Sequence, residues 1–204
     1  MKVHTDTFRT AGGVEVQRET KALSLEQPLA ELLKKLTTHR GAVFSSGYEY
    51  PGRYSRWDIG FVDPPLELVA RQRDFTFRSL NARGRVLLEI FRRGLEGHQH
   101  LIGLERVGDE LIGAVAPMPD YFPEEQRSKQ PTIFSVMRAL VAQMRAEGEQ
   151  HLGFYGSMGY DLVFQFEPID LRHERREDQP DLHLFLPDEL IVVDHRKEQA
   201  LRYT

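Results

Sequence analysis

The sequence has no cysteine and a single tryptophan among its 204 residues. Without cysteine it can form no disulfide, no thiolate nucleophile and no Cys-based zinc site. It also lacks an apolar run long enough to cross a bilayer, and residues 1–6 lack the apolar core of a secretory signal. Absence of cysteine is typical of cytosolic proteins, so we expect a cytoplasmic location.

Neither positive nor negative side chains are in large excess. The chain carries 27 Lys and Arg against 31 Asp and Glu, a formal net charge of -4. This balance excludes a broad basic field for nucleic acid. Hydrophobic residues make up 40% and charged residues 28% of the chain, as in an ordinary globular protein. We expect one large domain or one lobe of a larger protein, with neither nucleic acid nor a membrane as partner.

Hydrophobic periodicity predicts a mixture of helices and hairpins. Four helices are expected. The first follows the N-cap Ser24 and the third follows the N-cap Thr132, while the second spans 85–95 and the fourth 160–166. The apolar faces of the first three consist of Leu25, Leu29, Leu32, Leu33 and Leu36, of Val86, Leu87, Ile90 and Phe91, and of Ile133, Val136, Met137, Leu140, Val141 and Met144. Strands are expected over 41–46, 56–62, 66–70, 75–80, 101–105, 111–115, 182–186, 190–194 and 200–204. Since helices and strands do not alternate regularly, the fold class is α+β with mostly antiparallel sheet.

Three polar or terminal segments complete this outline. Residues 117–129 are rich in proline and charge, which predicts an excursion over the surface. Residues 172–181 are highly charged, which predicts a solvated loop. The sequence ends at Thr204 on a predicted strand without a polar tail, and we expect further chain to follow it.

Several residues could carry chemistry, but each has a simpler structural interpretation. His98 and His100 would share one face of a strand, as some metal ligands do, yet no third ligand has a recognisable spacing. Ser157 lies in a glycine-rich stretch, 153–159, that fits no phosphate-loop or nucleophile-elbow pattern and favours tight backbone packing. The carboxylates of Asp63, Asp161 and Glu167 are expected in turns or caps. We therefore predict no catalytic residue and no metal site.

The densest feature is the segment 45–58, in which two hydroxyls lead into an aromatic loop with two arginines. Hydroxyls and a cation suit a carboxylate or an amino acid, and aromatic rings supply an apolar wall. On the residues alone, a small-molecule site and an aromatic-rich turn are equally supported.

At this segment the sequence resembles a known family. Val-Phe-Ser-Ser at 43–46 followed by Gly-Arg-Tyr-Ser at 52–55 is similar to the Leu-Leu-Glu-Ser … Gly-Arg-Tyr-Ser signature of the anthranilate synthase large subunit, component I. The blocks at 155–168 and 186–195 resemble the next two conserved stretches of its N-terminal region, in the same order. The pattern is most similar to bacterial forms fused to a glutamine amidotransferase, and it spans nearly all of 1–204.

The resemblance implies a function for the whole protein and a smaller role for this chain. The family converts chorismate and glutamine or ammonia to anthranilate and pyruvate, the first step of tryptophan biosynthesis, and is a lyase. Its catalytic residues and its Mg²⁺ belong to a C-terminal chorismate-binding domain whose motifs do not occur here. We therefore expect an N-terminal regulatory and structural domain over 1–204, inactive alone and without a cofactor of its own. The implied partners are that domain and a glutamine amidotransferase domain or subunit, and a homodimer stays open.

The resemblance also implies a feedback site for L-tryptophan as allosteric inhibitor. Ser46 matches the serine of the signature, and Ser45 stands where the family usually has glutamate. Arg53 would hold the ligand carboxylate, and Tyr54 and Ser55 would line the pocket. Serine cannot pair with the ligand ammonium as glutamate does, which changes the chemistry at this position.

Two other interpretations remain open at the sequence level. The chain could be the corresponding lobe of aminodeoxychorismate synthase, which product identity would distinguish. It could instead be a stand-alone amino-acid-binding module. A stand-alone module predicts a compact and stable monomer, whereas a lobe of a larger enzyme predicts an exposed apolar face. A soluble α+β domain of other function is the remaining alternative.

Overall fold

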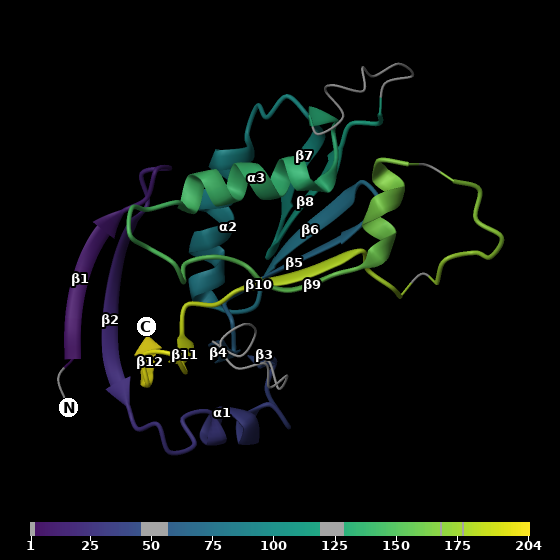
Figure 1. The fold of residues 1–204 in the computed structure, drawn as a ribbon. Coiled ribbons are helices and arrows are strands. Elements are labelled where there is room, and N and C mark those ends of the chain that lie inside the picture. The colour runs from purple at the N-terminus through teal and green to yellow at the C-terminus, as the bar shows by residue number, and fades with distance from the viewer. Residues whose placement is uncertain (1–2, 46–56, 119–128, 168, 177) are drawn as a thin grey trace. The chain divides into compact units, whose positions relative to one another are not determined.

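The computed structural model describes residues 3–45, 57–118, 129–167, 169–176 and 178–204. The chain divides into two compact units (Figure 1). The first comprises residues 1–9, 15–64 and 187–204, and the second comprises 10–14 and 65–186. Each unit contains one six-stranded antiparallel sheet among the described residues, so the predicted α+β class with antiparallel sheet is confirmed.

The sheet of the first unit has the strand order β1-β2-β12-β11-β4-β3. Its strands are β1 (Val3–Arg9), β2 (Glu15–Leu23), β3 (Gly41–Ser45), β4 (Trp57–Val62), β11 (Leu190–Asp194) and β12 (Gln199–Tyr203). The strands predicted over 41–46, 56–62, 190–194 and 200–204 are confirmed to within one residue where described. The last strand, β12, pairs on one side with β11 and on the other with β2.

The helix predicted to begin at Ser24 begins later than expected. Helix α1 spans Ala30–Lys35, and of the predicted leucine stripe only Leu32 is buried in it, while Leu33 is 52% exposed. Ser24 instead accepts a hydrogen bond from the backbone N–H of Glu26. The cause is Pro28, which disfavours the helical conformation in the residue before it. Gln27 has a φ of 51°, so the chain turns there before the helix begins.

The sheet of the second unit has the strand order β7-β8-β6-β5-β10-β9. Its strands are β5 (Leu66–Arg71), β6 (Asp74–Ser79), β7 (Leu101–Val107), β8 (Glu110–Val115), β9 (Tyr155–Met158) and β10 (Leu182–Leu186). Helices α2 (Ala82–Leu95) and α3 (Ile133–Met144) cover one of its faces (Figure 1). Side chains such as Leu68, Phe77 and Leu111 on that face are fully buried, so the core of this unit lies between the sheet and the helices.

The two long helices were both predicted, but each has one residue of its predicted apolar face exposed, Val86 and Val141. Asn81 caps α2 by accepting hydrogen bonds from two backbone N–H groups, so this helix starts before residue 85. Val86 is 63% exposed, and the buried residues are Gly84, Leu88, Phe91 and Leu95. Helix α3 follows Thr132 as predicted, with Val141 exposed. None of the helices that the structure describes has the length and apolar character needed to span a bilayer.

The charged segment 172–181 is a loop and is mostly exposed, as predicted, but it is also anchored to the protein. The guanidinium of Arg175, 13% exposed, pairs with the buried carboxylate of Asp181 and lies 2.8 Å from Asp161. Arg71 donates hydrogen bonds to the carbonyl oxygens of Arg175 and Arg176. Buried charges are stable in proteins when they are paired in this way, so charge in a sequence does not by itself indicate solvation.

Candidate functional site

The predicted tryptophan site falls mostly outside the described residues. Ser46, Arg53, Tyr54 and Ser55 are not among them, whereas Ser45 is the last residue of β3. Strand β4, which pairs with β3, begins at Trp57. What the structure describes of this site is therefore Ser45 and the side chains around it.

Ser45 lies in a small polar cluster at the ends of three elements. The register of β3 and β4 places Ser45 opposite Asp58, and the Ser45 hydroxyl donates a hydrogen bond of 2.7 Å to Asp58 Oδ1. The other carboxylate oxygen, Asp58 Oδ2, lies 2.8 Å from Nε2 of His195. We call Ser45, Asp58 and His195 the strand-end cluster. Its carboxylate is 19% exposed and its imidazole 49% exposed, so the carboxylate is half-buried, the imidazole is exposed, and both are within reach of a ligand.

The position of His195 is fixed by the turn between β11 and β12. Asp194, at the end of β11, is 5% exposed, and its Oδ1 accepts hydrogen bonds from the backbone N–H groups of Arg196 and Lys197 at 3.0 and 3.2 Å. An aspartate that binds the backbone two and three residues ahead stabilises such a turn. The turn holds the His195 ring against Asp58. An imidazole whose Nε2 donates to a carboxylate keeps its proton on that nitrogen.

Neither Asp58 nor His195 was singled out from the sequence. Asp58 belongs to the aromatic segment 45–58, and His195 is 137 residues from it along the chain. One signal was present: if the strands predicted over 41–46 and 56–62 pair as neighbours, their cross-strand register brings a residue near 58 opposite Ser45. No sequence feature indicated the approach of His195, which depends on the pairing of β4 with β11.

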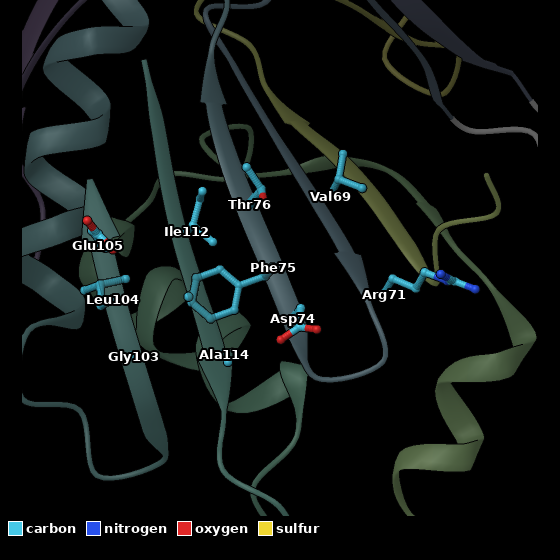
Figure 2. A pocket seen from close by; sticks show the side chains of 11 residues that line it. Val69, Arg71, Asp74, Phe75, Thr76, Gly103, Leu104, Glu105, Ile112 and Ala114 are labelled. Atoms are coloured by element: carbon cyan, nitrogen blue, oxygen red, sulfur yellow. The ribbon is translucent and has the colours of Figure 1, made fainter. Parts of the chain in front are cut away.

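A second candidate surface is the face of the second unit's sheet opposite α2 and α3. Register places Val69, Thr76, Ile112 and Glu105 in one row across β5, β6, β8 and β7. We call this side of the six strands the open face. A hollow of about 410 Å³ is lined mainly by its residues. Figure 2 shows these side chains, with Arg71 and Asp74 at one end. Ile112 is 40% exposed, so apolar side chains lie uncovered at the middle of the sheet.

Ion pairs lie next to this row of residues on the open face. The carboxylate of Glu67 is 3% exposed and lies 2.8 Å from Arg78 and 3.2 Å from Nε2 of His183. Arg78 also lies 2.6 Å from Glu110, and the hydrogen bond with Glu110 is the main cause that raises the pKa of the Arg78 guanidinium. The open face therefore combines uncovered apolar residues with an ordered set of charges, as interfaces between domains often do.

The remaining candidates from the sequence lie apart from both regions. His98 and His100 are in the turn before β7 rather than on a strand, with ring centroids 5.5 Å apart. Burial, then the charges of His100 and Arg138, lowers the pKa of His98. Asp161 pairs with Arg175, and Asp63 ends β4 with a φ of 51°. Over the part of the chain that the structure describes, no three His, Asp or Glu side chains are grouped as metal ligands would be.

The glycine-rich stretch has the structural role expected of it, although its partner is a strand. Gly156 in β9 lies opposite Leu184 of β10, and a side chain there would overlap the carbonyl oxygen of His183. The predicted helix over 160–166 is a 3₁₀ helix, η2 (Tyr160–Gln165). Ser157 is an exposed residue of β9.

Comparison with known proteins places these features in a family. No protein-family model matches the chain. It is 44% identical to anthranilate synthase of Azospirillum brasilense over 187 residues, which is 92% of this chain and 25% of that protein. It is 25% identical to anthranilate synthase component 1 of Haemophilus influenzae over 159 residues, 74% of this chain and 29% of that protein. A pyocyanine-specific anthranilate synthase component 1 of Pseudomonas aeruginosa is 25% identical over 149 residues, 72% of this chain.

The chain thus spans between a quarter and a third of the length of these relatives. The similarity covers both units of the fold, since 187 of 204 residues align with the Azospirillum protein. The chain is a relative of the large component of anthranilate synthase, and it corresponds to a part of that protein.

Proposed function

We propose that this chain is the N-terminal regulatory lobe of an anthranilate synthase. The intact enzyme would form anthranilate and pyruvate from chorismate and glutamine or ammonia, in tryptophan biosynthesis. The observation that carries the proposal is the 44% identity with the Azospirillum protein over 92% of this chain. In this scheme the Mg²⁺ and the catalytic residues belong to the chorismate-binding domain, and this chain contributes none of them.

The open face would be the docking surface for the chorismate-binding domain. An antiparallel sheet with one free face normally presents polar residues to water. Here Val69 and Ala114 are half-buried and Ile112 is 40% exposed at the middle of the sheet. The ion pair of Glu67 and Arg78 beside them would fix the orientation in which the chorismate-binding domain docks on this face. The glutamine amidotransferase would supply ammonia to the catalytic domain, as the resemblance implies.

Feedback inhibition by L-tryptophan would act through the segment that starts at Ser45. Tryptophan would bind to this lobe, next to the catalytic domain, and favour an arrangement with low chorismate affinity. Such coupling requires that the ligand bind one arrangement more tightly than the other, typically by about 1–3 kcal/mol. Ser46→Arg in the intact enzyme would then abolish inhibition by filling the pocket with a charged side chain.

A chimera tests the proposed function. This chain would replace the corresponding quarter of the Azospirillum enzyme, and anthranilate formation from chorismate and ammonia would be followed by fluorescence. We expect activity from the chimera and none from this chain alone or from the Azospirillum remainder alone. A chimera that folds but forms no product would contradict the proposal. The control is the same junction rejoined with the native Azospirillum segment.

A further inference from the structure

We propose that Asp58 is the anionic group of the amino-acid site, and that its carboxylate binds the ligand's primary ammonium group. This inference rests on the proposed sensing function and deepens it. The family signature normally has a glutamate at the position of Ser45, and Ser45 carries no charge. Asp58 lies directly opposite Ser45 on the neighbouring strand, with 2.7 Å between the serine Oγ and Asp58 Oδ1. The negative charge is therefore present at the same strand end, on β4 in place of β3.

The hydrogen bonds of the strand-end cluster leave room for an ammonium group. A carboxylate offers about four acceptor positions. Ser45 and His195 each occupy one, on different oxygens. Ser45 Oγ donates its proton to Asp58 and keeps its lone pairs as acceptors. An ammonium has three donors, which one position on Ser45 Oγ and two positions on Asp58 that no described residue occupies can satisfy.

Partial burial increases the strength of this interaction. The Asp58 side chain is 19% exposed, so part of its hydration is already lost while it stays accessible. Charge-assisted hydrogen bonds are about twice as strong as neutral ones, and a lower local dielectric strengthens them further. His195 and the Asp194 turn hold the carboxylate in place before the ligand arrives, so binding loses little conformational freedom.

The donor set favours ammonium over a metal ion. His195 directs Nε2 at Asp58, 2.8 Å away, and a nitrogen that donates a proton there has no lone pair for a cation. Among the described residues of the cluster, that leaves one carboxylate and one hydroxyl, fewer protein ligands than divalent metals usually take. Both remaining groups are hydrogen-bond acceptors suited to N–H donors. The chemistry therefore points to the α-ammonium of an amino acid.

Calorimetric titration of the full chain with two probes tests the inference. L-tryptophan carries the ammonium group, and indole-3-propionate has the same ring and carboxylate without it. We expect the wild-type chain to bind tryptophan more tightly than indole-3-propionate. Asp58→Asn should weaken tryptophan binding about 10- to 100-fold, the range for loss of a hydrogen bond to a charged group. It should leave indole-3-propionate binding equal or slightly stronger, because a repelling charge is removed.

The matched control is Asp63→Asn at the other end of β4, where the carboxylate is 58% exposed and asparagine tolerates the positive φ. This variant should bind both probes as the wild type does. Equal tryptophan affinity in Asp58→Asn and wild type would overturn the role of Asp58 and leave the sensing function intact. Equal affinity of the wild type for both probes would overturn it as well, whether or not the variant folds. No saturable binding of tryptophan by the wild type would overturn the sensing function and this inference together.

Discussion

At the scale of single residues, Glu89 of α2 has a carboxyl group whose pKa is strongly lowered. Its oxygens lie 3.1 Å from Arg92, 2.8 Å from Arg93 and 3.4 Å from Arg106. Hydrogen bonds from Arg92, then Arg93, lower the pKa of Glu89 to about 2. A folded-state pKa below the unfolded value gives stability that is present above about pH 4.3. That stability is lost as the pH falls toward 2.

Glu89→Gln should therefore flatten the acid side of the stability profile. The variant has no carboxyl group at this position, so its melting temperature should approach that of the wild type as the pH falls from 4.5 to 2. Thermal unfolding followed by circular dichroism across pH 2–7 measures both curves. If the two melting-temperature curves stayed parallel from pH 4.5 to 2, the ion pairs of Glu89 with its arginines would be contradicted. Because Glu89 lies at the surface, the difference should be small.

Gly156 provides a test of close packing between β9 and β10. A methyl group there would overlap the carbonyl oxygen of His183, so backbone must move to admit it. Gly156→Ala should lower the free energy of unfolding by about 1–3 kcal/mol, as overpacking usually does. The control is Gly153→Ala, since a Cβ at Gly153 meets no atom within 4 Å. Urea unfolding measures both, and equal stability of the two variants would count against the account.

At the scale of elements, Arg175 attaches the segment 170–181 to the rest of the second unit. Without this guanidinium, the carboxylate of Asp181, 1% exposed, would keep the backbone N–H of Gln72 as its hydrogen-bond donor among the described residues. Breaking a buried ion pair from one side typically costs about 3–5 kcal/mol. We expect Arg175→Met to lose about 3 kcal/mol of unfolding free energy and to be cleaved faster by trypsin within this segment. Arg172→Met, at an exposed position, is the control and should change neither stability nor cleavage elsewhere in the segment.

Most elements could be predicted from the sequence because they depend on local periodicity. The hairpin of β5 and β6 and the start of α3 after Thr132 are such cases. The start of α1 was wrong because the leucine spacing outweighed the effect of Pro28. The predicted apolar face of α2 was wrong at Val86. Its sequence allows more than one apolar face, and contact with the sheet buries Leu88 and Phe91.

The candidate site was predictable only in part, for a related reason. Ser45 could be named because it lies within a recognisable local motif. Asp58 and His195 join it through strand pairing between distant parts of the chain, and such pairing has no local signal. The same holds for Arg175 and Asp181, whose ion pair could not be anticipated from a run of charges.

At the scale of the whole molecule, the open face should matter for assembly and not for folding of this chain. Ile112 is 40% exposed at its centre, so Ile112→Lys should leave the melting temperature of the chain within a few degrees of the wild-type value. In the chimera, an unpaired charge buried at the docking surface should reduce anthranilate formation at least 10-fold. Val141→Lys on α3, 56% exposed, is the control and should retain activity. Full activity of the Ile112 variant would place the docking surface elsewhere.

This lobe should carry the enzyme's response to tryptophan. The most direct measurement is the inhibition of the active chimera by L-tryptophan, with L-phenylalanine in parallel and the chimera carrying Asp58→Asn as a third arm. We predict that tryptophan inhibits anthranilate formation in a saturable way, that phenylalanine does not, and that Asp58→Asn shifts half-inhibition to at least 10-fold higher tryptophan. An active chimera that tryptophan does not inhibit at any concentration would contradict the claim that this chain is a tryptophan-sensing lobe.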